Sequence, residues 1–227
     1  MTGLEPVLPA AKAGMTALGT LDQWRRNSEA AARTKQEKTA TRLLYNAQLI
    51  PFCCRALNET FKDVNVRIQA LPATATDEQI DTVADAVESL ADREDIVGRL
   101  ITAVAFLNQY SASAPGRFGK VLRAIQRQDA RNVAEQTLTE IAGLGEQALA
   151  IVGARAHDPT PIGVTELEAC LREARTPAEI RMVKQQAGGV LERIDGVLLR
   201  DAHEKIGTLT GALVQAYSLP PQGEIYF

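Results

Sequence analysis

Apolar residues recur every three or four positions along most of this 227-residue chain. In the clearest stretch they stand at Ile80, Val83, Val87 and Leu90. This is the spacing of one buried helix face, and no segment alternates with period two for long enough to predict a strand. Aromatic residues make up only 4% of the chain, so Leu, Ile, Val and Ala must fill the core. Both observations predict an all-α fold of closely packed helices.

Capping boxes, in which a Thr is followed three residues later by Glu or Gln, predict where helices begin. Four such pairs precede helical periodicity: Thr20–Gln23, Thr76–Gln79, Thr165–Glu168 and Thr176–Glu179. With the Pro and Gly positions they predict long helices over 20–71, 76–113, 116–155 and 176–218, and a short one over Val164–Arg175. Pro51 should kink or break the first helix near Ile50, and Asp92–Asp95 is a candidate local break in the second. We expect an elongated antiparallel bundle of four long helices with a short N-terminal helix.

Composition narrows the class of protein. Apolar residues make up 45% and charged residues 23% of the chain, which is ordinary for a globular protein. A net charge of −3 argues against a nucleic-acid partner. Three cysteines do not form a disulfide framework, and the start of the chain lacks the basic region of a signal peptide. These features predict a cytoplasmic protein.

Residues with catalytic or metal-binding chemistry are few and scattered. His157 and His203 have no Cys or His at ligand spacing, so we interpret them as surface residues and expect no metal or cofactor. Cys53 and Cys54 are interpreted as buried structural residues, with a catalytic thiol as the weaker alternative. We therefore predict that the protein is not an enzyme, although a site that the sequence does not reveal stays open.

The N-terminal segment has the most functional content. Between Glu5 and Asp22 its only charge is Lys12. Seven apolar residues fall broadly on one helical face: Leu4, Val7, Leu8, Ala11, Met15, Leu18 and Leu21. This segment is either a core helix of the bundle or a helix that packs on the bundle at rest and inserts into a membrane when released. We divide the chain into an apolar helix over 1–19, a bundle over 20–218 and a tail over 219–227.

Charge is uneven along the chain. Residues 1–72 hold ten basic and six acidic residues, whereas residues 73–114 hold two and eight. The basic first helix either packs against the acidic second one or offers a face to anionic lipid. For the second alternative the candidate lipid contacts are Lys12, Arg25, Arg26, Arg33, Lys35, Lys38 and Arg42.

A short apolar N-terminal helix before an elongated bundle with a basic first long helix resembles the HeLo-type cell-death domains. This family includes fungal HeLo domains, the membrane-executing four-helix bundles of plants and animals, and bacterial Bell domains. The local carrier of the resemblance is Leu4–Leu21, with stretches such as Glu5–Leu8 and Ala10–Gly14. No Asn/Gln-rich motif of the amyloid type follows in 218–227, so either the resemblance covers the executing domain alone or it is false.

The resemblance implies a bacterial cell-death or defence effector that permeabilises membranes through its N-terminal helix after activation. It further implies an anionic membrane, a homo-oligomer and an upstream signalling protein as partners, and movement to the inner face of the plasma membrane. The alternative hypothesis is a non-enzymatic scaffold or adaptor bundle that binds a partner through a helix face.

Overall fold

A computed structural model describes residues 8–91, 93–112, 121–123, 125–153 and 163–217. Within these ranges every regular element is a helix, which confirms the predicted all-α class. The elements are α1 (Leu8–Ala31), α2 (Lys35–Ala70), α3 (Asp77–Ala91), α4 (Glu94–Ala112), α6 (Gln128–Ile151), α7 (Val164–Glu173), α8 (Pro177–Glu192), the π-helix η1 (Arg193–Leu199) and α9 (Arg200–Tyr217). The predicted tail at 219–227 lies outside the described residues.

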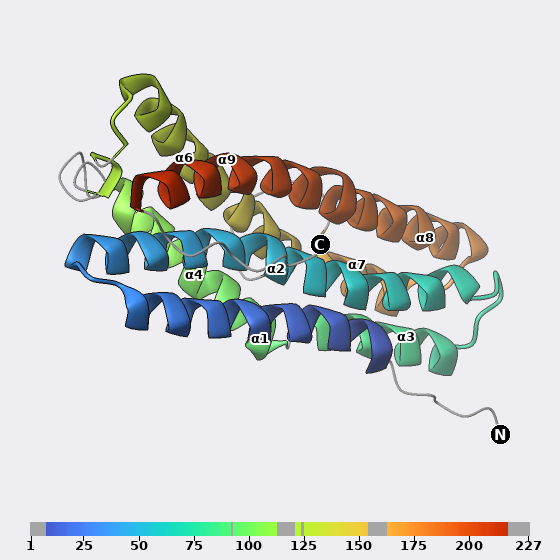
Figure 1. Ribbon diagram of the computed structural model, residues 1–227. Helices are drawn as coiled ribbons and strands as arrows, with labels where there is room; N and C mark the ends of the chain where they lie inside the picture. The colour runs from blue at the N-terminus through green and yellow to red at the C-terminus, as the bar shows by residue number, and fades with distance from the viewer. Residues whose placement is uncertain (1–7, 92, 113–120, 124, 154–162, 218–227) are drawn as a thin grey trace.

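Helix α2 is the centre of the molecule (Figure 1). It packs against α1 on one side, and α3, α4, α6, α8, η1 and α9 contact it elsewhere along its length. The elements α8, η1 and α9 follow one another without a break and form a rod that runs antiparallel to α2. This rod matches the long helix predicted over 176–218.

The helix predicted over 20–71 is in fact two helices. Residues 32–34 separate α1 from α2, and Thr34 caps α2: its hydroxyl accepts from the Glu37 N–H, and its own N–H donates to Glu37 Oε2 at 2.8 Å. The predicted boundary at residue 19 falls inside α1, where the Thr20 hydroxyl donates to the Thr16 carbonyl instead of capping a helix. The sequence contains the Thr34–Glu37 capping box, a signal that the prediction of one continuous helix overlooked.

Of the kink or break predicted at Pro51, the break is wrong. Helix α2 continues through this residue from Lys35 to Ala70. Proline removes one backbone hydrogen bond, but residues 43–54 of α2 are buried throughout. Packing on all sides holds the helix together where an exposed helix would break.

Two of the predicted capping boxes are confirmed, at Thr76 and Thr176. The box at Thr165 is wrong, because the N-cap of α7 is Gly163, two residues earlier, and its N–H donates to Glu166. The helix predicted over 76–113 is two helices, because α3 and α4 separate at the candidate break near Asp92–Asp95.

The helix predicted over 116–155 starts later than expected. Helix α6 begins at Gln128, and its Arg131 side chain donates to the carbonyls of Leu122 and Ile125, which precede it. These contacts tie the residues just before α6 back onto its first turn and so shorten the helix.

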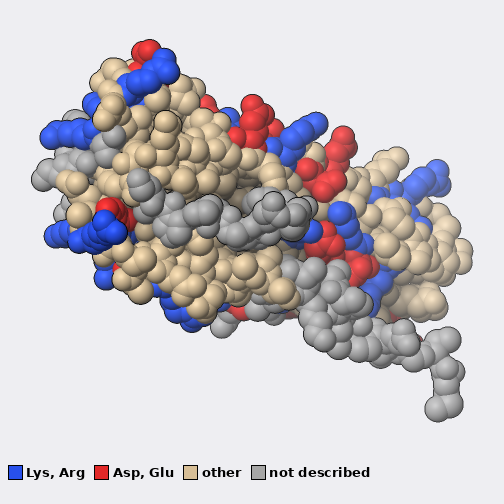
Figure 2. All heavy atoms as spheres, in the orientation of Figure 1, with Lys and Arg blue, Asp and Glu red and all other residues tan. Residues whose placement is uncertain are grey.

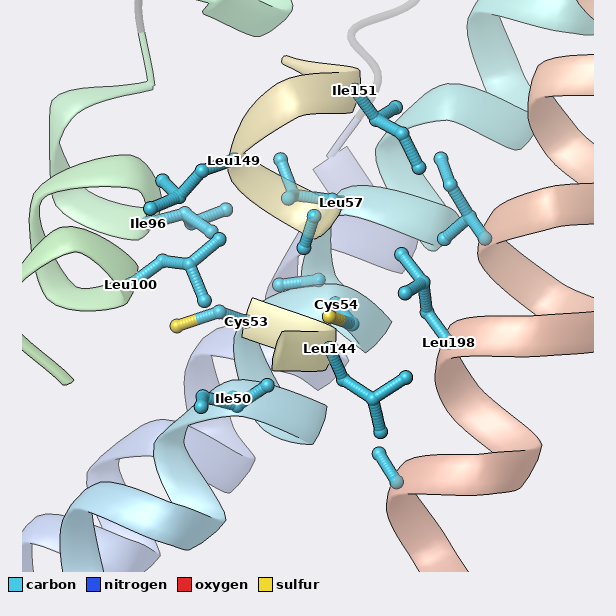
Figure 3. Close-up of a cluster of buried hydrophobic side chains, with 14 of the residues drawn as sticks. Ile50, Cys53, Cys54, Leu57, Ile96, Leu100, Leu144, Leu149, Ile151 and Leu198 are labelled. Atoms are coloured by element: carbon cyan, nitrogen blue, oxygen red, sulfur yellow. The ribbon is translucent and has the colours of Figure 1, made fainter. Parts of the chain in front are cut away.

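Part of the core lies between α2, α4, α6 and η1 (Figure 3). Cys53 and Cys54 of α2 are buried there among Leu100 of α4, Leu144 of α6 and Leu198 of η1. Helices α2, α4 and α6 meet at Gly145, where an added Cβ would lie 2.5 Å from Val104 Cγ2 and 2.9 Å from Ile50 Cδ1. The absence of a side chain at Gly145 therefore permits the close approach of three helices.

Candidate functional site

The structure describes only part of the predicted apolar face of the N-terminal segment. Leu4 and Val7 lie outside the described residues, and Leu8, Ala11 and Met15 belong to the first turns of α1. Leu18 and Leu21 are 1% and 0% exposed, and they belong to the same core as Trp24. In this state the C-terminal half of α1 is packed onto the bundle.

A polar cluster holds α1 to its neighbours, and we call it the Asp22 cluster. It consists of Asp22 and Arg25 of α1, Tyr45 of α2 and Arg99 of α4. The Tyr45 hydroxyl donates to Asp22 Oδ1 at 2.6 Å, and Arg99 Nη1 donates to Asp22 Oδ2 at 2.9 Å. The Arg25 guanidinium lies 4.7 Å from the centroid of the Tyr45 ring, at cation–π distance. One carboxylate thus links three helices.

This geometry changes the titration of two of these groups. Burial alone would raise the pKa of Asp22, but the hydrogen bonds from Tyr45 and Arg99 outweigh it, so the pKa is lowered. Burial and then the bond to Asp22 raise the pKa of Tyr45 to about 12. The cluster is therefore fully formed at neutral pH, with Asp22 charged and Tyr45 neutral.

Several buried polar atoms along the contact between α1 and α2 have no hydrogen-bond partner. Those on α1 are Trp24 Nε1, Arg25 Nε and Ser28 Oγ. On α2 they are Thr41 Oγ1 and Gln48 Oε1, which lie four residues before and three after Tyr45, on the same helix face. An unpaired buried polar atom costs about 1–3 kcal/mol, so this contact is less stable than its apolar residues alone would make it.

The predicted lipid contacts gather around the turn between α1 and α2. Arg26, Arg33, Lys35 and Lys38 are exposed, and we call them the basic turn. No carboxylate of the described residues lies within salt-bridge distance of these four side chains. Figure 2 shows Lys and Arg gathered at the end of the molecule that carries this turn.

The other predicted lipid contacts are placed differently. Arg42 pairs with Glu29 at 2.9 Å, and Arg25 belongs to the Asp22 cluster. Lys12 lies in α1, in the turns whose side chains are not described.

The acidic residues of 73–114 find their partners elsewhere. Arg172 of α7 pairs with Asp85 and Glu88 of α3 at 2.9 Å each, and Arg175 lies 3.9 Å from Asp77. Among the described ion pairs, the one that joins 1–72 to 73–114 runs from Arg99 to Asp22, opposite to the expected direction. Packing against the acidic helix therefore does not account for the basic turn.

The cysteines are buried, as predicted. Cys53 and Cys54 are 0% and 1% exposed, and burial raises the pKa of both thiols, that of Cys54 to about 12. Neither thiol is ionised at neutral pH, so neither has the thiolate that nucleophilic catalysis needs. No group of three or more metal-ligating side chains occurs among the described residues.

A groove between α2 and the rod was not predicted. Its cavity measures about 310 Å³ and is lined by Pro51, Arg55, Asn58, Glu59 and Lys62 of α2, Asp195 and Leu199 of η1, and His203 of α9. We call it the α2–α9 groove. Pro51 and His203 each drew attention in the sequence, but only the antiparallel packing of α2 and α9 brings them together. His157 lies outside the described residues.

No family model, curated protein or solved structure matches the chain. None of the described helices combines the length and the apolar character needed to cross a bilayer.

Proposed function

We propose that this protein is a non-enzymatic membrane-targeting effector of cell death or defence. In this proposal the basic turn binds anionic lipid, α1 separates from α2 after activation, and its apolar face enters the membrane interface and permeabilises it. The observation that carries the proposal is the combination, on one helix pair, of an exposed basic turn with a contact that contains five unpaired buried polar atoms.

The magnitudes support an opening of α1. Burial of Leu18 and Leu21 stabilises the packed state by about 1.5–3 kcal/mol each. The unpaired atoms of Trp24, Arg25 and Ser28 cost about 1–3 kcal/mol each and regain water when α1 leaves. These costs offset part of the stabilisation that burial provides, so they lower the free energy needed to separate this helix.

The basic turn alone binds weakly. Each basic residue near an anionic surface contributes about 1 kcal/mol, so four give about 4 kcal/mol, or roughly millimolar affinity. Stable attachment therefore also needs the apolar face of α1, or several copies acting together, which is why we include a homo-oligomer in the proposal. Asp22, Arg25, Arg26 and Glu29 occupy the last turns of α1, so we expect the helix to lie along the interface.

A reversible cross-link tests this proposal. Glu29→Cys and Arg42→Cys, introduced with Cys170→Ser, replace an ion pair that bridges α1 and α2. A bis-methanethiosulfonate reagent across them should abolish dye leakage from phosphatidylserine vesicles, and reductant should restore it. The matched control is Glu140→Cys with Lys205→Cys, an ion pair between α6 and α9, whose cross-link should leave leakage unchanged. Leakage that survives the α1–α2 cross-link contradicts the proposal.

The second candidate function is a scaffold or adaptor bundle. The burial of Leu18, Leu21 and Trp24 in the shared core favours the scaffold hypothesis, because a helix that belongs permanently to the core stays packed. The two hypotheses predict different results for the triple variant Arg33→Glu, Lys35→Glu and Lys38→Glu. If the protein is an effector, this variant should lose vesicle binding while its melting temperature stays unchanged. If the unaltered protein neither binds nor permeabilises vesicles, the scaffold hypothesis holds.

A further inference from the structure

The α2–α9 groove lies between two helices that are fixed against each other. Asn58 Nδ2 donates to Asp195 Oδ1 at 2.9 Å, which ties α2 to η1 at one end of the groove. Pro51 and Leu199 form apolar walls. The π-helical turn directs Leu198 into the core while Leu199 lines the groove, and such turns recur at functional sites. A cavity of about 310 Å³ is at the small end of the range for ligand sites.

One end of the groove is positively charged. The Arg55 guanidinium lines it, is half-buried, and has no carboxylate of the described residues within salt-bridge distance. His203 lines the same groove, and burial and then the charge of Arg55 lower its pKa. A guanidinium presents five donors in a planar fork that matches a phosphate or carboxylate.

The charges at the other end of the groove are paired. Asn58 is 1% exposed, and its Oδ1 is buried without a partner. The charge of Asp195 is offset by the Asn58 amide and by Lys62, whose ammonium lies 3.9 Å from Asp195 and 3.8 Å from Glu59. The carboxylates of the groove are therefore balanced locally, whereas the charge of Arg55 is not.

We propose that the α2–α9 groove binds a small soluble phosphomonoester. The phosphate oxygens accept from the Arg55 guanidinium and from the His203 ring. Phosphate fits better than carboxylate because two groups that can carry positive charge, Arg55 and His203, face the same end. This inference does not depend on the membrane proposal, since the groove lies on the side of α2 that the rod covers, away from α1.

The presence of only two histidines makes the test direct. In a His157→Gln background the remaining imidazole signals in a proton NMR spectrum belong to His203. Glycerol 3-phosphate is the probe, and we expect a saturable shift of these signals together with an upward shift of the His203 pKa, because a phosphate dianion stabilises the imidazolium. Arg55→Ala should weaken binding at least tenfold, and Arg55→Lys should recover part of it.

The matched control is Arg67→Ala, which removes an arginine from the same helix outside the groove and should leave binding unchanged. Melting temperatures of all variants separate loss of binding from loss of fold. The proposal is overturned if glycerol 3-phosphate gives no saturable shift, or if Arg67→Ala weakens binding as much as Arg55→Ala does. Inorganic phosphate that binds equally well would remove the ester from the proposal. A shift with phosphatidic acid vesicles and none with glycerol 3-phosphate would overturn the soluble ligand in favour of a lipid headgroup.

Discussion

Helix α2 has two sides with opposite chemistry. Toward α4, α6 and η1 it presents Ile50, Cys53 and Cys54, which pack against leucines and a glycine. Toward α1 it presents Tyr45, which bonds to Asp22, and the unpaired buried atoms Thr41 Oγ1 and Gln48 Oε1. The contacts of the first side are mainly apolar, with the Asn58–Asp195 hydrogen bond added, whereas the polar atoms of the second side regain water when it opens. A helix can be well packed and still be the element most easily removed.

This difference predicts two levels of stability within one bundle. Proteins open in cooperative units whose free energies range from near zero to the global value. We expect α1 to open at a lower free energy than the unit formed by α2, α4, α6 and the rod. The comparison can be tested by perturbing the two sides separately.

The largest expected effect is that of Leu100→Ala. Leu100 belongs to α4, lies beside the side of α2 that faces α4, α6 and η1, and is 0% exposed. Its truncation should reduce the free energy of unfolding by about 2–5 kcal/mol. The matched variant on the other side is Leu21→Ala, also 0% exposed, which should mainly speed hydrogen exchange in α1. Urea unfolding with peptide-resolved exchange measures both. Equal acceleration of exchange in α1 and α6 by Leu21→Ala would mean that the two sides are one cooperative unit.

Gly145→Ala should have the next largest effect. The new Cβ would meet Val104 of α4 and Ile50 of α2 at distances too short for carbon atoms, so the helices must move apart. Overpacking of this kind costs about 1–3 kcal/mol, more than alanine gains in helix propensity. Gly143→Ala is the control, because a Cβ at that position would have nothing within 4 Å, and it should stabilise the protein or leave it unchanged. Thermal unfolding that gives the same shift for both glycines would contradict the close approach.

The sequence was sufficient for the all-α class and for the rod over 176–218. The capping boxes at Thr76 and Thr176 mark the starts of α3 and of the rod, and apolar periodicity continues along both. These signals are local and do not depend on tertiary packing. The prediction of a break at Pro51 failed because the burial of α2 outweighs the tendency of proline to end a helix. Burial depends on the packed molecule and is not visible in the local sequence. The prediction failed at residues 32–34 because apolar periodicity continues on both sides of the turn.

The candidate site was less predictable than the fold. The exposure of the basic turn depends on where the acidic residues of α3 find partners, and Arg172 is distant from them in the sequence. The Asp22 cluster joins three helices, and no spacing along one helix encodes it. The α2–α9 groove likewise needs the antiparallel register of Asn58 and Asp195.

Loss of the Asp22 cluster should have a smaller effect than either core variant. Asp22→Asn weakens the bonds from Tyr45 and Arg99, and because the site is partly solvated the expected loss is about 1 kcal/mol. The pKa of Asp22 is lowered in the folded state, so its contribution is present above the unfolded value near 4 and is lost as pH falls through the lowered value. Hydrogen exchange in α1 should therefore accelerate in acid before that of α6. Asp22→Asn should remove this acid dependence, and an unchanged pH profile in that variant would assign it to another carboxyl.

The smallest expected effect has the opposite sign. Thr41 is 0% exposed and its hydroxyl has no partner, so Thr41→Val keeps the shape of the side chain and removes a buried unpaired atom. We expect a gain of up to about 1 kcal/mol and slower hydrogen exchange in α1. Thr60→Val is the matched control, because the Thr60 hydroxyl is buried but donates to the Ala56 carbonyl at 2.8 Å, so its removal should be neutral or destabilising. If Thr41→Val also slows vesicle leakage, the unpaired atoms of this interface contribute to the opening of α1. If both variants destabilise the protein equally, the two sides of α2 do not differ in the way that the burial of their polar atoms indicates.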